Sequence, residues 1–312
     1  MIFTSRVIGF GSYLPQKLVT NAALAETIDT NDDWIRQRTG IEQRHIAEDN
    51  QMCSDLGYHA AMAALEKAGV SASDVDMIVL ATTTPDHPLP ATATRIQAKL
   101  GAITAFAFDV QAVCSGFVYA LAVADNFIRC GQAKKVLVIG AETISKIVDW
   151  QDRSTCILFG DGAGALLLTA EENNNSGGIL STHLFSDGHG YDSLYVDNSI
   201  ETPNNRGFMK MDGREIFKSA VEKIGQAIEK ALDYNKLDVS DIDWFVPHQA
   251  NRRIIEAVSA RFQIPMEKTV LTIQGHANTS AASIPLAMVA AANDGRIKPG
   301  GGITWGAALI RW

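Results

Sequence analysis

One cysteine of the sequence occupies a position that could make its thiol a nucleophile. Cys114 lies between the apolar segment AFAFDV (105–110), typical of a buried strand, and the segment GFVYALAVADNFIRCG (116–131), typical of a buried helix. The free N–H groups and the dipole at a helix N-terminus favour an anion, and the thiolate is the reactive form of cysteine. Because cysteine is also a common small buried residue, the rest of the chain must decide between the two interpretations.

A histidine and an asparagine far along the chain are candidate partners of this cysteine. His248 follows the predicted strand IDWFV (242–246), and Asn278 precedes the small residues TSAAS (279–283) at a predicted helix start. One use of such a set is peptide hydrolysis, in which the histidine activates the thiol. Another is acyl transfer through a thioester, in which histidine and asparagine bind an oxygen that becomes negative. The local signature of papain-like proteases is absent, which favours acyl transfer.

An internal repeat supplies the elements that would bring these residues together. The segments VSASDVDMIVLATTTP (70–85) and LDVSDIDWFVPHQAN (237–251) share an acidic turn followed by an apolar strand. Each follows a predicted helix and precedes a helix, a strand and a further helix in the same order. Alternating strands and helices indicate a parallel sheet covered on both faces, so the repeat predicts a duplicated α/β architecture. The asparagine-rich EENNNSGG (171–178) is the expected boundary between halves 1–174 and 175–312.

Superposing the two halves brings the candidate residues to one side of the fold. Cys114 falls opposite Asn278, each at the start of its central helix, and His248 falls opposite Thr84, just past a strand end. Ligands bind α/β sheets at strand ends and helix starts on one side. The three residues can therefore converge although they are far apart in the sequence, and this favours a chemical role for Cys114.

Composition and charge exclude several classes of protein. The four cysteines show no CxxC pair and no cluster with histidine, so no metal site is expected. The formal net charge of −8 argues against a nucleic-acid-binding protein. We expect a cytoplasmic location, because we recognise no signal peptide and no long apolar span. The motif GDGAG (160–164) lacks the lysine of a P-loop, so we expect close backbone packing there and no phosphate.

Several long segments resemble the family of β-ketoacyl-acyl-carrier-protein synthase III, the initiating condensing enzyme of type II fatty acid synthesis. The segments that carry the resemblance are QAVCSGFVYAL, VPHQANRRI, GHANTSAASIPLA, GGITWGAALIRW, NDDWIRQRTGIEQRHIA and FGDGAGALLL. They extend over almost the whole chain. The resemblance implies a thiolase-like α/β fold, with two duplicated halves that each have a central mixed sheet, and helices layered between and outside the sheets (α-β-α-β-α). It also implies a homodimer.

The resemblance implies that Cys114, His248 and Asn278 are the catalytic residues. Cys114 would accept a short acyl group, expected to be acetyl, from acyl-CoA. His248 and Asn278 would then bind the thioester carbonyl of malonyl-acyl-carrier protein while CO₂ leaves, and transfer of the acyl group would give β-ketoacyl-acyl-carrier protein. The backbone N–H groups of Cys114 and Gly301 would form the oxyanion hole. No cofactor is needed, because the CoA thioesters are substrates.

The resemblance also assigns substrate-binding positions. Trp34 matches a residue that stacks on the CoA adenine, with Arg153 on its other side, and Arg253 matches a position that docks the acidic carrier protein. Leu89 matches a position that reaches across the dimer to the floor of the acyl pocket, where an aromatic residue is often found. Because leucine is smaller, we expect this pocket to accept chains longer than acetyl. Further matches around the CoA channel are Thr30, Arg38, Gly213 and Asn251. A wider basic patch for the carrier protein is expected from Lys210, Arg214, Lys218, Arg252 and Arg261.

Three other functions stay open on the sequence alone. The first is a specialised acyl-CoA condensing enzyme of secondary metabolism with the same three residues. The second is a hydrolase that uses them, and the third is a catalytically inactive partner with a thiolase-like fold. A β-ketoacyl product from acetyl-CoA and malonyl-carrier protein would support a condensing enzyme, and release of free acid alone would indicate a hydrolase.

The C-terminal half lacks a segment that the repeat requires. The N-terminal half closes with two predicted strands, 135–142 and 156–169, whereas GRIKPG (295–300) is followed by only one, ITWGAALIRW. The resembled family has further, mostly apolar residues here. Three glycines cannot span a strand and reverse its direction. We therefore expect either a break in the chain between Pro299 and Ile303, or a second sheet that has lost a strand and left the glycine donor beside Cys114 unsupported.

Overall fold

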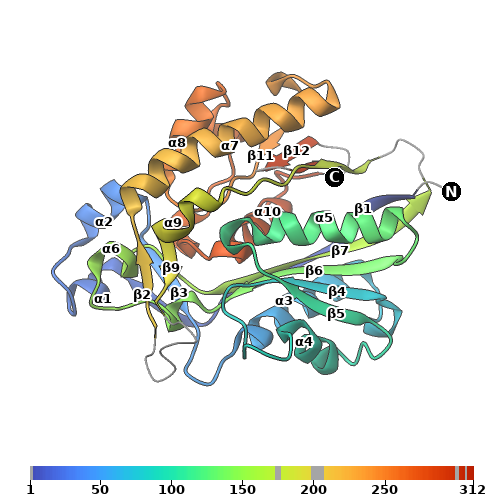
Figure 1. The fold of residues 1–312 in the computed structure, drawn as a ribbon, viewed down its shortest axis with the longest axis horizontal. Coiled ribbons are helices and arrows are strands. Elements are labelled where there is room, and N and C mark those ends of the chain that lie inside the picture. The colour runs from blue at the N-terminus through green and yellow to red at the C-terminus, as the bar shows by residue number, and fades with distance from the viewer. Residues whose placement is uncertain (1–2, 173–176, 198–206, 299–301, 306–307) are drawn as a thin grey trace.

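Two β-sheets form the centre of the molecule, and helices lie between them and outside them (Figure 1). The computed structural model describes residues 3–172, 177–197, 207–298, 302–305 and 308–312. The first sheet consists, in spatial order, of β1 (Phe3–Tyr13), β7 (Gly162–Glu172), β6 (Lys135–Glu142), β4 (Met77–Ala81) and β5 (Phe106–Val110). Strand β4 is parallel to β5 and β6, whereas β7 is antiparallel to both of its neighbours, so the expected mixed sheet is present.

The remaining elements have the following bounds. The α-helices are α1 (Asn21–Ala25), α2 (Asp32–Thr39), α3 (Cys53–Ala68), α4 (Thr92–Leu100), α5 (Gly116–Arg129), α6 (Arg153–Cys156), α7 (Gly213–Asn235), α8 (Arg252–Arg261), α9 (Ile273–His276) and α10 (Ser283–Asn293). The other strands are β2 (Lys17–Thr20), β3 (Gln43–Ile46), β8 (Gly178–Thr182), β9 (Leu194–Val196), β10 (Met209–Met211), β11 (Trp244–Phe245), β12 (Gly302–Trp305) and β13 (Ala308–Arg311). The 3₁₀ helices are η1 (Ala72–Asp74), η2 (Val113–Ser115), η3 (Ile144–Lys146), η4 (Gly188–Ser193), η5 (Val239–Asp241), η6 (Met266–Lys268) and η7 (Ser280–Ala282).

Strand β4 explains why both faces of the first sheet are covered. All five of its residues are buried, and successive side chains of a strand point to opposite faces. Met77, Val79 and Ala81 belong to an apolar cluster with residues of α5 and α10. Ile78 and Leu80 belong to another cluster, with residues of α3 and α4. The uninterrupted apolar run of β4 is therefore buried by helices on both sides, as expected for a parallel strand.

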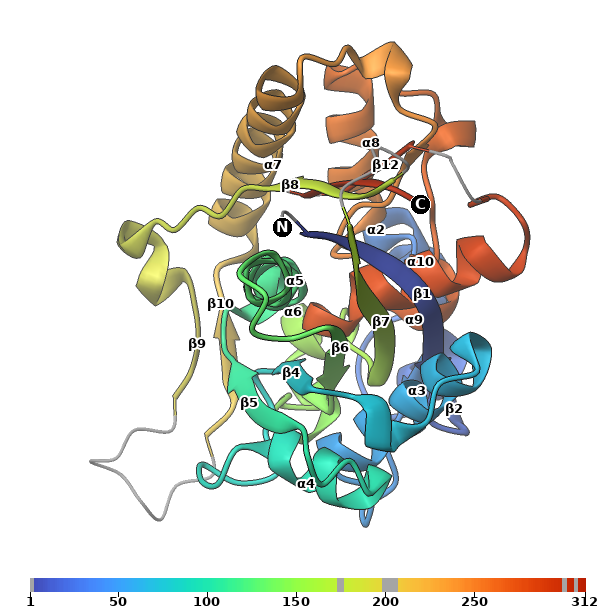
Figure 2. The ribbon, with the colours of Figure 1, turned by 90° about the vertical axis from the view of Figure 1, so that its right-hand side faces the viewer.

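The second sheet completes a five-layered arrangement. Its strands have the order β11-β12-β13-β8, and residues of β8 and β13 join α5, α10 and β4 in one apolar cluster. Helices α7 and α8 pack on its outer face, through a cluster that includes Phe245 and Leu309. Figure 2 shows α5 and α10 between the two sheets. The α-β-α-β-α layering predicted from the sequence is confirmed. In the described part of the chain, no helix is both long and apolar enough to cross a membrane.

The C-terminal strands differ from the sequence-based interpretation. The segment interpreted as one final strand forms two, because β12 lies between β11 and β13, parallel to the first and antiparallel to the second. In the first sheet β6 occupies the same position between β4 and β7. Four residues thus supply the penultimate strand that appeared to be missing. The second sheet has four strands in the described residues, and the counterpart of β5 is a single bridge between Phe245 and Thr269. The expected break in the chain between Pro299 and Ile303 would involve residues 299–301, which lie outside the described residues.

The motif GDGAG packs closely against neighbouring backbone, as predicted. A Cβ atom added to Gly164 would lie 2.8 Å from the backbone nitrogen of Leu286, and one added to Gly160 would lie 2.9 Å from the carbonyl oxygen of His276. The carboxylate of Asp161 accepts hydrogen bonds from the backbone N–H groups of Ala47 and Ser145. The motif therefore joins the end of the first sheet to the segment that carries Asn278.

A methyl group at Gly140 should disturb the packing of η7 on the first sheet. The Cβ of an alanine at this position would lie 2.4 Å from the carbonyl oxygen of Ala281, which is backbone and cannot rotate away. We expect Gly140→Ala to lower the free energy of unfolding by about 1–3 kcal/mol, the usual cost of overpacking. Thermal or denaturant unfolding measures this loss. Gly188→Ala is the matched control, because nothing lies within 4 Å of the added Cβ, and an equal loss in both variants would contradict the interpretation.

Candidate active site

Cys114 lies at the predicted junction of a strand and a helix. It is the central residue of η2, which follows β5 and leads directly into α5. The preceding residue, Val113, has a φ of 49°, in the left-handed region that β-branched residues avoid. Such strain persists only where the surrounding structure imposes it. Here a Cβ added to Gly116 would lie 3.2 Å from the Cβ of Ala81, so the start of α5 is held tightly against the end of β4.

The thiol of Cys114 is less acidic than its position in the sequence suggested. Removal of the thiol from water, together with the negative charge of Glu142, raises its pKa to about 11. The hydroxyl of Ser280 and the backbone N–H of Cys114 lower this pKa, but by less. Desolvation thus opposes the effect expected from the helix N-terminus, which favours the thiolate. At neutral pH the resting residue is a thiol.

Glu142 is a buried carboxylate that the sequence did not single out. It ends β6, and its side chain has no exposure to solvent. Its oxygens accept hydrogen bonds from the hydroxyls of Thr83 at 2.7 Å and Thr84 at 2.6 Å, and from the backbone N–H groups of both residues. Burial raises its pKa, and these hydrogen bonds lower it. Glu142 thus fixes the loop after β4 and adds negative charge near the nucleophile.

His248 follows β11 and is neutral. Burial lowers the pKa of its imidazole to about 4, so the ring carries one N–H at neutral pH. Its Nδ1 atom lies 2.5 Å from Oγ of Ser283, the first residue of α10. The side chain of the next residue, Gln249, is fully buried and donates to the carbonyl oxygens of Pro247 and Val270. The loop that carries His248 is therefore held in one conformation.

Asn278 lies between α9 and η7, and a hydrogen bond holds its side-chain amide group in one orientation. Its backbone donates to Leu158 and accepts from Gly160, which places it beside the end of the first sheet. Its Oδ1 atom accepts a hydrogen bond of 2.9 Å from the backbone N–H of Ser280. Because the oxygen is engaged in this way, the NH₂ group is the part of the side chain that can donate to a ligand.

The segment Asn278–Ser283 connects the three candidate residues. It contains Asn278 itself, its 3₁₀ helix η7 packs against η2, which carries Cys114, and Ser283 bonds to His248. The structure thus brings together three residues from the two halves of the chain. Sequence reasoning missed Ser283, because a serine in a run of small residues gives no signal that distinguishes a hydrogen-bond partner of a site residue from a packing residue.

A cavity of about 670 Å³ leads to this region. Of the three candidates, Asn278 lines it, and Cys114 and His248 do not. Trp34 also lines it, and the guanidinium carbons of Arg38 and Arg153 lie 4.6 and 4.8 Å from the centre of its ring. The other cavity-lining residues that the sequence predicted are Gly213, Asn251 and Arg253. Four arginines, Arg38, Arg153, Arg214 and Arg253, line the cavity, and such a group suits a polyanionic ligand.

Two further predicted site residues, Thr30 and Leu89, do not line this cavity. Thr30 does not line it, although its hydroxyl is buried without a hydrogen-bond partner in the described structure. Leu89 does not line it either, and its side chain is 80% exposed on the isolated chain. Gly301, the second predicted donor of the oxyanion hole, lies outside the described residues. Asn251 does line the cavity, and it accepts from the backbone N–H of Arg253 at the start of α8.

The high pKa of the Cys114 thiol predicts the pH dependence of its alkylation. The rate with iodoacetamide should rise about tenfold per pH unit from pH 7 to pH 10, because only the thiolate reacts. Removing the charge in Glu142→Gln should lower the pKa and shift the profile to lower pH. Peptide mass spectrometry in a Cys130→Ser background isolates this site from the exposed Cys130. A rate that reaches its plateau below pH 9 in the parent protein would contradict the assignment.

Comparison with known proteins matches both halves of the chain. Residues 108–188 match the model of the family described as 3-oxoacyl-[acyl-carrier-protein (ACP)] synthase III, and residues 232–312 match the model of its C-terminal part. A β-ketoacyl-[acyl-carrier-protein] synthase III of Paramagnetospirillum magneticum is 56% identical over 323 residues, covering 100% of both chains. This chain has 312 residues, so the alignment contains positions that it lacks.

Solved structures agree with these matches. The 3-oxoacyl-[acyl-carrier-protein] synthase III of Aquifex aeolicus superposes with a TM-score of 0.93 at 42% identity, covering 99% of this chain and 100% of that one. The priming β-ketosynthase of the R1128 polyketide biosynthetic pathway gives a TM-score of 0.92 at 34% identity, covering 99% and 96%. The fold, the convergent residues and these likenesses lead to one conclusion: the chain belongs to the β-ketoacyl-acyl-carrier-protein synthase III family.

Proposed function

We propose that this condensing enzyme starts fatty acid synthesis by transferring an acetyl group from acetyl-CoA to Cys114 and then to malonyl-acyl-carrier protein. The initiating condensing role is that of the family, and the finer assignment is ours. The observation that carries it is the convergence of Cys114, His248 and Asn278 on one segment beside an arginine-lined cavity. This chemistry proceeds through thioesters and calls for no metal or redox group.

The first step is acyl transfer to the thiol. The sulfur of Cys114 attacks the thioester carbonyl, its S–H proton is lost, and CoA leaves as a thiol after gaining a proton. The negative charge on the carbonyl oxygen is stabilised by N–H donors, of which the backbone N–H of Cys114 at the start of α5 is one. A second donor from Gly301 remains our sequence-based assignment.

The second step is decarboxylation and condensation. Asn278 offers its NH₂ group and neutral His248 offers one N–H to the thioester carbonyl of the malonyl group. Loss of CO₂ leaves an enolate, whose oxygen carries the charge that these donors stabilise. The enolate carbon attacks acyl-Cys114, the C–S bond breaks, and the thiolate released takes up a proton. The product is β-ketoacyl-acyl-carrier protein.

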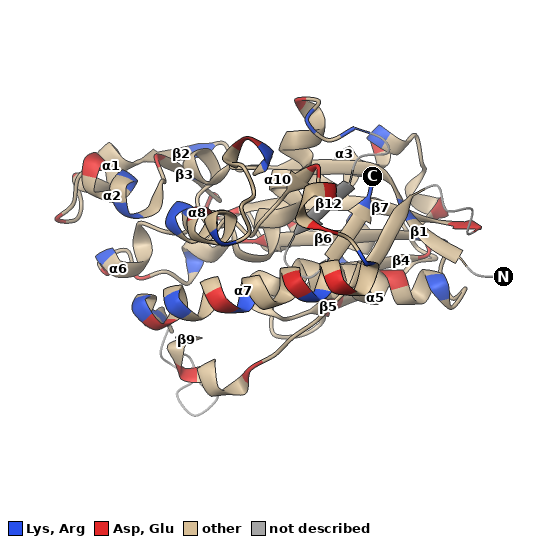
Figure 3. Cartoon of the chain, turned by 90° about the horizontal axis from the view of Figure 1, so that it is seen from above, with Lys and Arg blue, Asp and Glu red and all other residues tan. Residues whose placement is uncertain are grey.

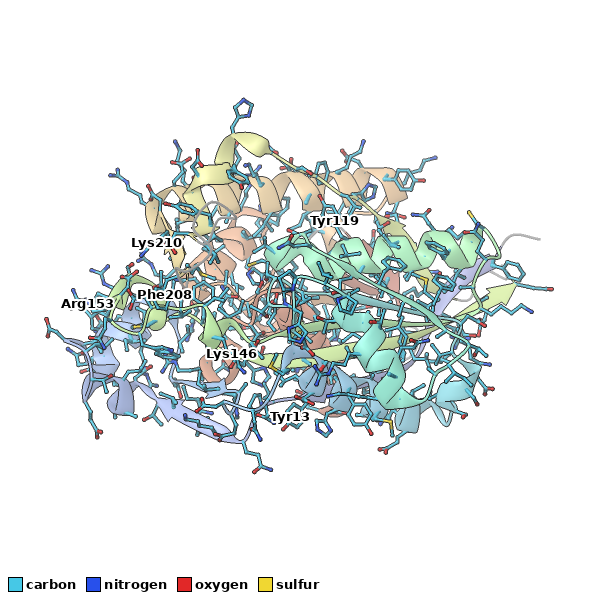
Figure 4. All side chains as sticks on the ribbon, turned by 60° about the horizontal axis from the view of Figure 1, so that its bottom comes forward. Tyr13, Tyr119, Lys146, Arg153, Phe208 and Lys210 are labelled. Atoms are coloured by element: carbon cyan, nitrogen blue, oxygen red, sulfur yellow. The ribbon has the colours of Figure 1, made fainter. Side chains whose placement is uncertain are left out.

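The cavity suits the CoA portion of the first substrate. Trp34 presents an aromatic face for the adenine, and the arginines Arg38 and Arg153 beside it can pair with phosphates. Arg153 also donates to the backbone oxygen of Asp29, which anchors it at the end of the molecule where Lys210 lies (Figure 4). Gly213 and Asn251 line the channel along which the pantetheine arm would extend.

We assign docking of the acidic carrier protein to the surface around the start of α8. Figure 3 shows positions of Lys and Arg, coloured blue, on α7 and α8. On α8, Arg252 is paired with Glu256 and Arg261 with Glu229, and on β10 Lys210 is paired with Asp197. Within the described chain, Arg253 forms no ion pair and its guanidinium lies 5.7 Å from the ring of Phe217. It is therefore free to meet a carboxylate or phosphate of the partner.

We also propose a homodimer, which would give Leu89 its role. Strand β5 is an edge of the first sheet, and Phe106 at its start is 41% exposed. An exposed apolar edge strand invites pairing with a second copy. Leu89 would then reach the acyl pocket of the partner subunit. As a residue smaller than an aromatic one, it would leave room for acyl groups longer than acetyl.

A specialised acyl-CoA condensing enzyme is the second candidate function. The likeness to the R1128 priming β-ketosynthase favours it, because that protein serves a polyketide pathway with the same fold. Competition among acyl-CoA primers of different length, with malonyl-carrier protein as extender, distinguishes the two. Preference for acetyl-CoA supports the first proposal, and preference for a longer primer supports the second.

Substitution of the three candidate residues should separate the two half-reactions. Cys114→Ala should form no acyl-enzyme, which mass spectrometry of the protein measures. His248→Ala and Asn278→Ala should still be acylated, yet lose about 10²–10³-fold in decarboxylation of malonyl-carrier protein, the usual cost of an oxyanion donor. Parent rates of decarboxylation in these variants would refute the donor role, and an acyl adduct on Cys114→Ala would refute the nucleophile.

Charge reversal at Arg253 should weaken use of the carrier protein more than use of CoA. We expect Arg253→Glu to raise KM for malonyl-carrier protein several-fold, with a smaller change in acylation by acetyl-CoA, and added salt should reduce the difference. Lys134→Glu makes the same charge change on an exposed residue before β6 and is the matched control. Equal losses for both substrates would argue against docking at Arg253.

A further inference from the structure

The hydrogen bonds of His248 indicate a further residue for the reaction. Nδ1 of its ring lies 2.5 Å from Oγ of Ser283, and Ser283 is only 2% exposed. A buried hydroxyl must find both its donor and its acceptor partners inside the protein. Because the imidazole is neutral, it has a single N–H, and the partner of one nitrogen decides which nitrogen carries the proton.

The contacts of the Ser283 hydroxyl set the direction of this hydrogen bond. An N–H can only donate, and that of Gln249 donates to Oγ of Ser283 at 3.4 Å. The hydroxyl proton then has Nδ1 of His248 as its acceptor within the described residues. If Nδ1 carried the proton instead, the proton of Ser283 would be buried without an acceptor, an arrangement that native structures avoid.

The side chain of Gln249 is itself fixed by buried hydrogen bonds, so its backbone N–H cannot easily move away from Ser283. Its Nε2 donates to the carbonyl oxygens of Pro247 and Val270, and its Oε1 accepts from the backbone N–H groups of Thr272 and Ile273. These bonds hold the backbone of the loop between β11 and α8. The N–H that orients the Ser283 hydroxyl is therefore part of a rigid, fully buried unit.

We propose that Ser283 is a positioning residue that keeps the single proton of His248 on Nε2. Nε2–H can then donate to the thioester carbonyl and to the enolate oxygen during decarboxylation. With the proton on Nδ1, a lone pair of Nε2 would face these oxygens and repel them. This inference rests on the donor role proposed above for His248. It explains why a neutral histidine, which could present either a donor or an acceptor, presents a donor here.

The tautomer itself can be measured without any assay of activity. NMR of protein labelled with ¹⁵N-histidine distinguishes a protonated ring nitrogen from an unprotonated one by its chemical shift, and His248→Ala identifies the signals of this residue. In the parent protein we expect Nε2 to be protonated and Nδ1 to be unprotonated at pH 7–8. A parent spectrum with the proton on Nδ1 would overturn the proposal, whether or not any variant folds.

Two substitutions at Ser283 and one control test its role. Ser283→Ala should move a measurable fraction of His248 to the Nδ1–H tautomer and slow decarboxylation of malonyl-carrier protein at least tenfold, toward the ~10²–10³-fold loss of an oxyanion donor. Acylation of Cys114 should change little. Ser283→Thr keeps the hydroxyl and should restore both readouts. Ser259→Ala is the control, because Ser259 is equally buried and bonds to Thr269, away from His248.

The outcomes separate this proposal from the proposed function. If His248→Ala slows decarboxylation while Ser283→Ala leaves both tautomer and rate unchanged, the donor role stands and the proposal for Ser283 is wrong. If Ser283→Ala changes the tautomer but not the rate, Ser283 does not serve the reaction through His248, and the proposal is also overturned. A change in both, absent in Ser259→Ala, supports it.

Discussion

The position of the short 3₁₀ helix η7 (Ser280–Ala282) controls the geometry of the whole candidate site. The carbonyl oxygen of Ala281 lies so close to Gly140 that a single methyl group on β6 would collide with it. This contact fixes the segment Asn278–Ser283 against the first sheet. The same six residues include Asn278, η7, which packs on the Cys114 segment η2, and Ser283, which bonds to His248. The candidate residues of the two halves are thus aligned through a common neighbour.

Much of this arrangement follows from patterns that a single sequence contains. The apolar run of β4 and the repeat of strand and helix predict the layers, since a strand buried on both faces must be apolar at every residue. The same repeat predicts that Cys114 and Asn278 occupy equivalent helix starts. Those predictions depend on the periodicity of apolar residues and on the repeat, which are local patterns that a single sequence contains.

Other features depend on contacts that no local pattern encodes. The raised pKa of the Cys114 thiol comes first from its burial, which is a property of the packed core, and then from Glu142, which follows 28 positions later in the chain. The link between Ser283 and His248 joins two segments separated by 35 residues. The final strands were misassigned because ITWGAALIRW is apolar or small almost throughout, and only hydrogen-bond partners distinguish β12 from β13.

The electrostatic character of the site suits a reaction in which charge appears on oxygen. Burial keeps His248 neutral and Cys114 protonated, so the resting groups carry no charge that would have to be neutralised. Donors fixed in a poorly polarisable environment stabilise a developing oxyanion strongly, because they need not reorient when it forms.

The protonated state of the Cys114 thiol also bears on oxidative damage. Peroxides oxidise thiolates in preference to thiols, and the first product, a sulfenic acid, would disable the nucleophile. A thiol with a pKa of about 11 is almost entirely protonated at the pH of a cell, so the resting enzyme presents little of the form that peroxide attacks. Burial of Cys114 thus lowers the fraction of the thiolate form that an oxidant could attack between turnovers.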